Sequence, residues 1–247
     1  GAFYGGEPIW VTAEKQGLKT ASFYWVGSEA PINNTQPSRW KKYDQRFPYE
    51  ARVDTVIAWL QLPEKDRPRL ITWYYPEPDE VSHRFSPESQ ETVEKLEYLD
   101  VLIGDFLKKL SQLPIANQVN VIITADHGMT RISGDKVIYF EDYIQTTWLD
   151  TALGGNPFWM LDAKEGFSDS IYLYLKNTPH LQVWKKDSLP ERLHYGVNPR
   201  VMDFVVTADL HWSIGMHSHE YPENFVGGTH GYDPKYKDMH AIFYATG

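Results

Sequence analysis

Short apolar runs alternate with segments of helical periodicity along most of the chain. Apolar residues recur every three or four positions within residues 50–62 and 87–113, and this spacing predicts two helices. The runs at 69–75 (RLITWYY) and 119–124 (VNVIIT) predict buried strands instead. Strands that alternate with helices are typical of βαβ units. We therefore expect an α/β fold with a mostly parallel sheet and helices on both of its faces.

Weaker patterns account for the rest of the chain. Residues 8–16 predict a short helix. The remaining strand candidates are residues 18–25, 170–175, 201–207 and 241–244. The stretches 128–168 and 176–232 are rich in Gly, Pro and Asn, so we expect long loops and small insertions there. No repeat, linker or low-complexity tract interrupts the sequence, and one domain over residues 1–247 is the simplest organisation.

The charge and the residue types present exclude several classes of function. The formal net charge of −9 disfavours a nucleic-acid polymer as partner, because contacts to phosphates require Lys and Arg. The chain contains no cysteine, which removes disulfides, thiolate metal sites and thiol nucleophiles. Any bound metal must then be held by His, Asp and Glu. No stretch of about 18 uncharged apolar residues occurs, so we expect no membrane span in this chain.

Three short clusters concentrate the residue types that bind metal ions. They are residues 75–83 (YPEPDEVSH), 125–129 (ADHGM) and 227–233 (GGTHGYD). The first two directly follow the two predicted buried strands, and ligands of open α/β sheets bind outside the carboxyl ends of the strands. The two clusters would therefore lie side by side if their strands are neighbours in the sheet.

Within each of these two clusters the spacing favours side chains that converge on one point. Asp79 and His83 are four positions apart, so one helical turn after the strand would bring them together. Asp126 and His127 are adjacent, and a tight turn would let both converge, with Gly128 giving the backbone the freedom to form it. Carboxylate oxygens and imidazole nitrogens suit zinc and related first-row metals.

Each cluster taken alone has a simpler interpretation. Asp79 could serve only as a helix N-cap or turn residue, because an aspartate after a strand often bonds local N–H groups. His127 and His230, each beside a glycine, could be histidines with satisfied hydrogen bonds at the surface or in the core. Two Asp/His clusters at consecutive strand ends, together with a glycine-flanked histidine, are much less expected to occur by chance than any one cluster alone. The combination favours a metal site.

The three clusters, in this order and spacing, resemble the metal-binding motifs of the nucleotide pyrophosphatase/phosphodiesterase family, within the alkaline phosphatase superfamily. ADHGM is shared more widely in the superfamily, whereas its combination with PDxxxH and GTHGYD narrows the resemblance to this family. Further similar segments are residues 6–14, 23–29, 47–50 and 240–243. The resemblance extends over nearly the whole chain and implies an alkaline-phosphatase-like α/β fold.

In that family two zinc ions lie side by side, and the matching motifs imply their ligands in this chain. One ion would be bound by Asp79, His83 and His230. The other would be bound by Asp126 and His127, together with an Asp and a nucleophilic Thr that the family carries upstream of the GEPIW segment. The same donor set would accept manganese or cobalt.

The resemblance also implies a reaction, the hydrolysis of nucleotide phosphodiester or pyrophosphate bonds with release of a nucleoside monophosphate. The upstream Asp and Thr are not in this sequence, and neither Thr130 nor Thr229 matches the nucleophile motif. We therefore expect no catalytic residue in this chain, no catalysis by it alone, and a sheet that lacks its first strand region. The alternatives are a phosphomonoesterase or a lysophospholipid/glycerophosphodiester hydrolase of the same fold, and an inactive metal-binding fragment.

Two tyrosines are candidate substrate contacts for a small nucleotide or phosphodiester. Tyr43 has a spacing that resembles that of the family's base-stacking tyrosine, although a surface aromatic in a loop is the simpler interpretation, and Tyr74 lies at a predicted strand end near the first cluster. An aromatic face that stacks on a base contributes about 1–3 kcal/mol. Asp233 and Glu77 are candidates to orient histidine ligands. The family works mostly outside the cytoplasm, so we expect an extracellular or periplasmic location.

Overall fold

The computed structural model describes residues 5–247, which divide into two compact units. Unit 1 contains the described residues up to Glu77 together with Leu96–Val119 and Gly247. Unit 2 contains Pro78–Lys95 and Asn120–Thr246. All five residues that the sequence predicts as metal ligands therefore belong to unit 2. None of the helices within residues 5–247 combines the length and the apolar character that crossing a bilayer requires.

A small parallel sheet lies at the centre of unit 1. Strand β1 (Thr20–Phe23) pairs in parallel with β2 (Arg39–Lys41) on one side and with β3 (Leu70–Trp73) on the other. Every residue of β1 is buried, whereas β2 is exposed and forms an edge. This burial explains why the segment around β1 is uniformly apolar or small, as expected for a strand covered on both faces.

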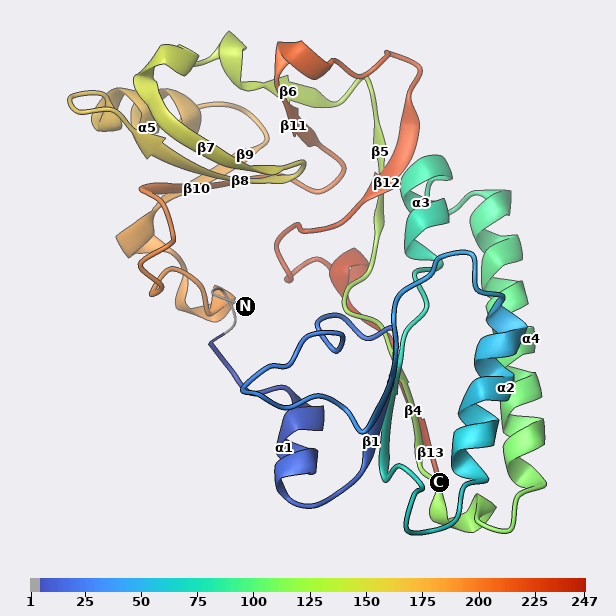
Figure 1. Ribbon diagram of the computed structural model, residues 1–247. Helices are drawn as coiled ribbons and strands as arrows, with labels where there is room; N and C mark the ends of the chain where they lie inside the picture. Colours follow the sequence, from blue (N-terminus) through green and yellow to red (C-terminus); the bar gives the residue numbers. More distant parts are fainter. Residues whose placement is uncertain (1–4) are drawn as a thin grey trace. The chain divides into compact units, whose positions relative to one another are not determined.

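Helices cover both faces of the unit 1 sheet. Helix α1 (Ile9–Lys15) lies on one face, and α2 (Tyr49–Leu60) lies on the other, together with the unit 1 part of α4 (Gln90–Ser111) (Figure 1). The 3-10 helix η1 (Ala116–Gln118) follows α4. The helices predicted at residues 8–16, 50–62 and 87–113 are thus confirmed, with ends that differ by a few residues.

The local sequence explains where α2 begins and which face it buries. Pro48 occupies the N-cap position, and Glu50 places an acid in the first turn, where the helix dipole favours negative charge. The buried apolar residues recur at helical spacing. They are Val53, Val56, Ile57, Trp59 and Leu60.

Arg52, on the same helix, is fully buried. Its Nη2 donates to the Phe47 carbonyl oxygen at 3.2 Å, and its Nη1 donates to the Tyr74 carbonyl oxygen at 3.5 Å. Its guanidinium carbon lies 4.2 Å from the centroid of the Tyr49 ring and 4.9 Å from that of Tyr24. Burying a cation is costly unless hydrogen bonds and aromatic faces replace its water. Arg52 therefore ties α2 to the residues that precede it and to those that follow β3.

The four-stranded sheet of unit 2 is antiparallel, in the order β7-β8-β10-β9. Its strands are β7 (Leu149–Gly155), β8 (Phe158–Ala163), β9 (Leu181–Lys185) and β10 (Phe204–Ala208). Helix α5 (Ser168–Lys176) connects β8 to β9. The hydrophobic core of unit 2 includes Phe140, Leu161, Ile171, Leu175, Phe204, Val206 and Ile214.

Pairs of strands complete unit 2, together with helix α3 (Asp79–Phe85). The antiparallel pairs are β4 (Val121–Thr124) with β13 (Phe243–Thr246), and β5 (Thr130–Ser133) with β12 (Val226–Thr229). The parallel pair is β6 (Val137–Tyr139) with β11 (Ser213–Gly215). The 3-10 helices are η2 (Phe140–Asp142), η3 (Thr146–Trp148), η4 (Lys186–Ser188), η5 (Glu191–Leu193), η6 (His217–His219) and η7 (Lys237–Met239).

The predicted α/β class is confirmed, although the sheets are mixed and not mostly parallel. Parallel pairing is found in the unit 1 sheet and between β6 and β11, whereas the other pairs of the described residues are antiparallel. Strand β3, which precedes the first Asp/His cluster, pairs with β1 in unit 1, and β4, which precedes the second, pairs with β13 in unit 2. β4 is also less buried than predicted, since Ile122 is 63% exposed.

Two predictions for unit 2 are wrong. Residues 170–175 form part of helix α5 and not a strand, because Ile171 and Leu175 are buried four positions apart while Leu173 and Tyr174 between them are exposed. Residues 128–168 are not mainly loop, because they contain β5 to β8. Their Gly, Pro and Asn residues lie partly at turns between strands, such as the Asn156-Pro157 turn that joins β7 to β8.

Replacement of Arg52 by Met should destabilise the protein. Met fills a similar volume but cannot make the hydrogen bonds that Arg52 donates to the Phe47 and Tyr74 carbonyl oxygens, so we expect the free energy of unfolding to fall by about 2 kcal/mol. Urea unfolding followed by circular dichroism measures this change. Arg46→Met is the matched control, since the Arg46 side chain is 92% exposed and its loss should cost less than about 0.5 kcal/mol. Equal effects of the two substitutions would contradict the role assigned to Arg52.

Candidate metal centre

Asp79 and His83 come together at the start of helix α3. Pro78 occupies the N-cap position and makes no side-chain capping bond, so Asp79 is the first helical residue and not the cap. One turn later His83 lies on the same face, and its Nε2 is 3.4 Å from Asp79 Oδ1. The alternative that Asp79 serves only as a helix N-cap is therefore wrong.

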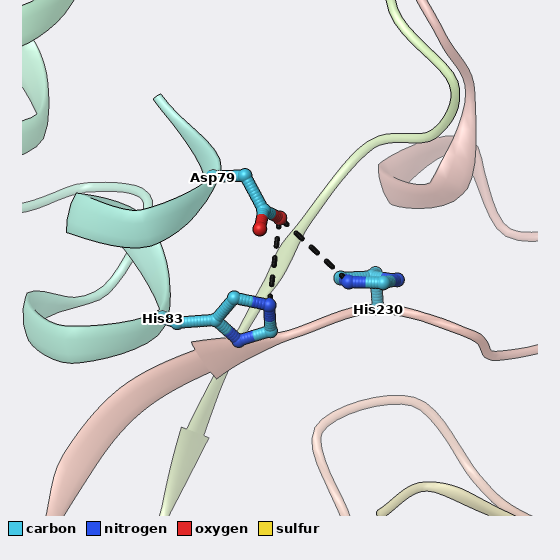
Figure 2. Close-up of side chains that lie close together, drawn as sticks. All are labelled: Asp79, His83 and His230. Atoms are coloured by element: carbon cyan, nitrogen blue, oxygen red, sulfur yellow. Dashed lines mark ion pairs between the residues drawn. The ribbon is translucent and has the colours of Figure 1, made fainter. Parts of the chain in front are cut away.

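His230 joins this pair from the segment that follows β12 (Figure 2). Its Nε2 lies 3.6 Å from Asp79 Oδ1, and its ring centroid lies 5.0 Å from that of His83. One ligand atom from each of the three residues lies within 4.8 Å of the other two. Within residues 5–247 this is the only group of three His, Asp or Glu residues with such spacing.

Two glycines let β12 approach α3 closely enough to form this group. A Cβ atom on Gly228 would lie 2.5 Å from the Ser82 carbonyl oxygen, and one on Gly227 would lie 2.7 Å from the His83 carbonyl oxygen. Both distances are shorter than any side chain tolerates, so only glycine fits at these positions. The GG pair before Thr229 was a sequence signal for this contact, and sequence reasoning missed it.

The same approach orients the His83 ring. His83 Nδ1 lies 2.8 Å from the Gly228 carbonyl oxygen, which can only accept, so Nδ1 carries the proton. In the neutral ring Nε2 then carries the lone pair, and this atom faces Asp79. His127 repeats this arrangement, with Nδ1 2.9 Å from the Gly128 carbonyl oxygen. A carbonyl that fixes the tautomer is typical of metal-binding histidines.

Asp126 and His127 lie beside the first group. The His127 ring stacks on His230, with centroids 3.5 Å apart and planes at 14°. Asp126 Oδ2 is 3.4 Å from His127 Nε2, and the Asp126 side chain is 80% exposed. Gly128 is required for a different reason from the one predicted. It does not adopt a positive φ, but a Cβ there would lie 1.9 Å from the Asp238 carbonyl oxygen.

The chemistry of these side chains fits a divalent cation. Asp79 Oδ1 is buried and accepts no hydrogen bond from the described residues. Burial lowers the pKa of the His230 imidazole, and the His127 ring lowers this pKa further, against the opposing effect of Asp79. His230 is thus neutral at neutral pH, and a neutral imidazole offers the lone pair that a metal needs. A cation placed among Asp79, His83 and His230 would satisfy the orphaned carboxylate oxygen.

The two predicted substrate tyrosines belong to unit 1 and not to the unit that carries the metal candidates. The Tyr43 ring is 42% exposed and contacts the Tyr24 ring edge-on, with centroids 5.1 Å apart. The backbone N–H of Tyr74 donates to the Phe23 carbonyl oxygen at 3.0 Å, which continues the pairing of β3 with β1. The Tyr43 ring thus packs on an aromatic neighbour, and the Tyr74 backbone is held by the unit 1 sheet.

Asp233 does not orient a histidine in this structure. Both of its carboxylate oxygens accept hydrogen bonds from Arg192, at 2.6 Å each. Arg192 was missed by sequence reasoning, and no motif marks it, because it lies in the Gly/Pro/Asn-rich stretch that was predicted to be loop. Glu77, the other candidate to orient a histidine ligand, belongs to unit 1, whereas the metal candidates belong to unit 2.

Comparison with known proteins agrees with this geometry. The family model of type I phosphodiesterase/nucleotide pyrophosphatase matches residues 1–233. The chain belongs to this family. Venom phosphodiesterase of Naja atra is 37% identical over 259 residues, which cover 100% of this chain and 30% of the venom protein. Ectonucleotide pyrophosphatase/phosphodiesterase family member 3 of Rattus norvegicus is 35% identical over 256 residues, which cover 100% of this chain and 29% of the rat protein.

Solved structures of the family confirm the fold. Murine ectonucleotide pyrophosphatase/phosphodiesterase 5 matches with a TM-score of 0.87 and 33% identity, over 97% of this chain and 63% of that chain. An inactive Thr-to-Ala variant of the same murine protein, in complex with AMP, matches equally well. The fold of this family member is therefore alkaline-phosphatase-like. The chain spans about 30% of the length of the curated relatives it matches.

Replacement of Gly228 by Ala should separate β12 from α3. The added Cβ would overlap the Ser82 carbonyl oxygen, and we expect a loss of about 1–3 kcal/mol in the free energy of unfolding. Because His83 and His230 would move apart, zinc affinity should fall at least about tenfold. Thermal unfolding and chelator competition measure the two effects. Gly155→Ala is the control, since its Cβ would meet nothing within 4 Å. Unchanged zinc affinity in a folded Gly228→Ala variant would contradict the role of the β12–α3 contact in bringing His83 and His230 together.

Replacement of Asp79 by Asn should have opposite effects with and without metal. Without metal, the substitution removes a charge whose buried Oδ1 has no hydrogen bond, so the free energy of unfolding should rise by about 1 kcal/mol. With zinc, the wild-type chain should be the more stable, because only it gains from binding. Melting temperatures in chelator and in zinc test this crossover. Asp187→Asn, an exposed site, should show no crossover. If wild type and Asp79→Asn kept the same order of melting temperature in chelator and in zinc, the result would contradict the metal site.

Proposed function

We propose that these 247 residues form most of a single catalytic domain that hydrolyses nucleotide phosphodiester or pyrophosphate bonds and releases a nucleoside monophosphate. The observation that carries the proposal is the convergence of Asp79, His83 and His230 in a member of the type I phosphodiesterase/nucleotide pyrophosphatase family. The AMP complex of the murine relative supports a small nucleotide as ligand. A nucleic-acid polymer is disfavoured by the net charge of −9.

The metal centre of the proposal uses all five Asp and His residues. Asp79, His83 and His230 would hold one zinc ion. Asp126 and His127 would hold a second one, with an Asp and a Thr from an upstream segment completing its ligands. When bound, two zinc ions would supply the Lewis acidity that stabilises charge on the phosphoryl oxygens and activates a hydroxyl nucleophile. The oxygen and nitrogen donors would also accept manganese or cobalt.

The chain's own residues would prepare this centre before any substrate arrives. The Gly228 and Gly128 carbonyl oxygens hold His83 and His127 as the Nδ1–H tautomer, so each Nε2 keeps a lone pair for a ligand bond. The stacked rings of His127 and His230 keep the two ligand groups adjacent. Tyr43 and Tyr74 would contact the substrate, with an aromatic face available for stacking on a base.

The nucleophile of the proposed reaction is an upstream Thr, and this chain alone is proposed to be inactive. Two threonines that lie close in sequence to the metal candidates are already engaged. Thr130 is 1% exposed and its hydroxyl donates to Asp238 Oδ2 at 2.9 Å, and Thr229 is 6% exposed and donates to the Asn156 carbonyl oxygen at 3.4 Å. The inactive Thr-to-Ala variant of the murine relative agrees with a threonine nucleophile.

An extracellular or periplasmic location belongs to the same proposal. It rests on the relatives, which are described as venom phosphodiesterases and as ectonucleotide pyrophosphatases. Zinc that is bound by Asp and His alone requires no reduced thiols, so the metal centre is compatible with an oxidising compartment.

The test of the proposed function is hydrolysis of a nitrophenyl nucleotide ester by the chain alone and by the chain extended at its N-terminus, each with zinc. We expect activity only in the extended chain, with about two zinc ions bound, since two-metal sites are typical of such displacements. His230→Ala should remove most of this activity, whereas His219→Ala, at an exposed position in the same unit, should retain it.

A nitrophenyl phosphate monoester serves as the comparison substrate. Diester turnover well above monoester turnover supports the proposal. The reverse ratio would identify a phosphomonoesterase of the same fold, and an extended chain with zinc but without turnover of either ester would leave a metal-binding protein. Either result would overturn the proposed nucleotide phosphodiesterase.

A further inference from the structure

The best-paired buried charge of unit 2 is the Asp233 carboxylate. Its side chain is 1% exposed, and Arg192 Nη1 and Nη2 donate to its two oxygens at 2.6 Å each. The backbone N–H of Lys235 donates to Oδ1 at 3.0 Å. Two parallel bonds from a guanidinium to a carboxylate form the strongest and most directional ion pair in proteins. The Arg192 guanidinium holds the pKa of Asp233 below its ordinary value, so the carboxylate stays charged.

Asp233 lies on the loop that leaves His230. The loop turns at Gly231, which has a φ of 101°, a conformation that favours glycine. The next side chain, Tyr232, is buried, and its hydroxyl donates to the Trp212 carbonyl oxygen at 2.7 Å. Since only two residues separate His230 from Asp233, the position of the carboxylate limits the path of the backbone at His230.

Arg192 reaches Asp233 from a segment that is anchored elsewhere. It lies in η5, between β9 and β10 of the four-stranded sheet. Nearby, the Tyr195 ring packs edge-on against Phe158 of β8, and its hydroxyl contacts Met160 Sδ at 3.1 Å. The Arg192–Asp233 pair therefore connects the four-stranded sheet to the loop of His230, across 41 positions of sequence.

We propose that Arg192 is a positioning residue for the metal centre, which fixes the loop of His230 through its paired hydrogen bonds to the buried Asp233 carboxylate. The inference rests on the proposed function, because it takes His230 to be a metal ligand. Removing the guanidinium would leave a buried carboxylate without its partner, and such a charge drives local rearrangement toward water. The His230 imidazole would then lose its fixed position opposite Asp79.

Lys235 cannot take over the role of Arg192. Its Nζ lies 3.6 Å from Asp233 Oδ2, and its side chain is 47% exposed. An ammonium group is a point charge, which cannot form the two parallel bonds of a guanidinium. The geometry of the pair, and not only its charge, is therefore required.

The experiment measures zinc affinity by competition with a chelating dye, alongside the melting temperature of the metal-free chain. Arg192→Met should weaken zinc binding about tenfold, the lower end of the range for residues that orient metal ligands. Arg192→Lys keeps the charge but loses the paired bonds, so its affinity should lie between those of wild type and Arg192→Met. The double variant Arg192→Met/Asp233→Asn removes the stranded charge and should bind zinc more tightly than Arg192→Met alone.

Two further variants make the result decisive. Lys185 lies in β9 of the same four-stranded sheet and forms an exposed ion pair with Asp169 of α5. Lys185→Met breaks this pair and should leave zinc affinity unchanged. His230→Ala tests the metal site itself, and unchanged affinity there would remove the proposed site and this inference with it. If His230→Ala weakens zinc binding but Arg192→Met and Arg192→Lys lower only the melting temperature, Arg192 is merely structural and the inference is overturned, while the proposed function stands.

Discussion

The close contact between β12 and the end of α3 is the constraint on which the candidate metal centre depends. Gly227 and Gly228 carry no side chain, so the backbone of β12 reaches the carbonyl oxygens of Ser82 and His83 at distances that a Cβ would not allow. That approach supplies the Gly228 carbonyl oxygen to His83 and delivers His230 to Asp79. The candidate ligands converge because the backbones of β12 and α3 are in close contact, and this contact sets the positions of the side chains.

The arrangement of the candidate ligands lowers the stability of the metal-free protein. A carboxylate oxygen is buried without a hydrogen bond, two imidazoles stack face to face, and the uncharged form of His230 is favoured. A buried oxygen without a hydrogen bond is unfavourable for folding alone, whereas a cation bound there would compensate the carboxylate charge. Functional sites commonly concentrate such locally unfavourable arrangements, which the surrounding structure maintains. Here the surrounding structure includes the glycine contact and the Arg192–Asp233 pair.

The parts of this architecture that depend on local sequence were predictable. The pairing of Asp79 with His83 follows from one helical turn, and the long helix α4 follows from its periodicity. Motif order also singled out Asp79, His83 and His230, which the structure brings together. The parts that failed either lack an unambiguous local pattern or depend on contacts distant in sequence. Helix α5 was mistaken for a strand because a short apolar run does not reveal its period, and the strands of residues 128–168 find their partners up to about 100 residues away. The role of Arg192 could not be predicted from the sequence, because only the folded chain brings it to Asp233.

The hydrogen bond between His83 and Gly228 joins residues that are 145 positions apart. Closing so long a loop is entropically expensive, and proteins dominated by such contacts fold slowly. Asp79 and His83 lie one helical turn apart, but His230 reaches them only when β12 docks against α3. The candidate metal centre is therefore complete only after this long loop has closed. A cation held by Asp79, His83 and His230 would connect the two ends of this loop and would slow its reopening.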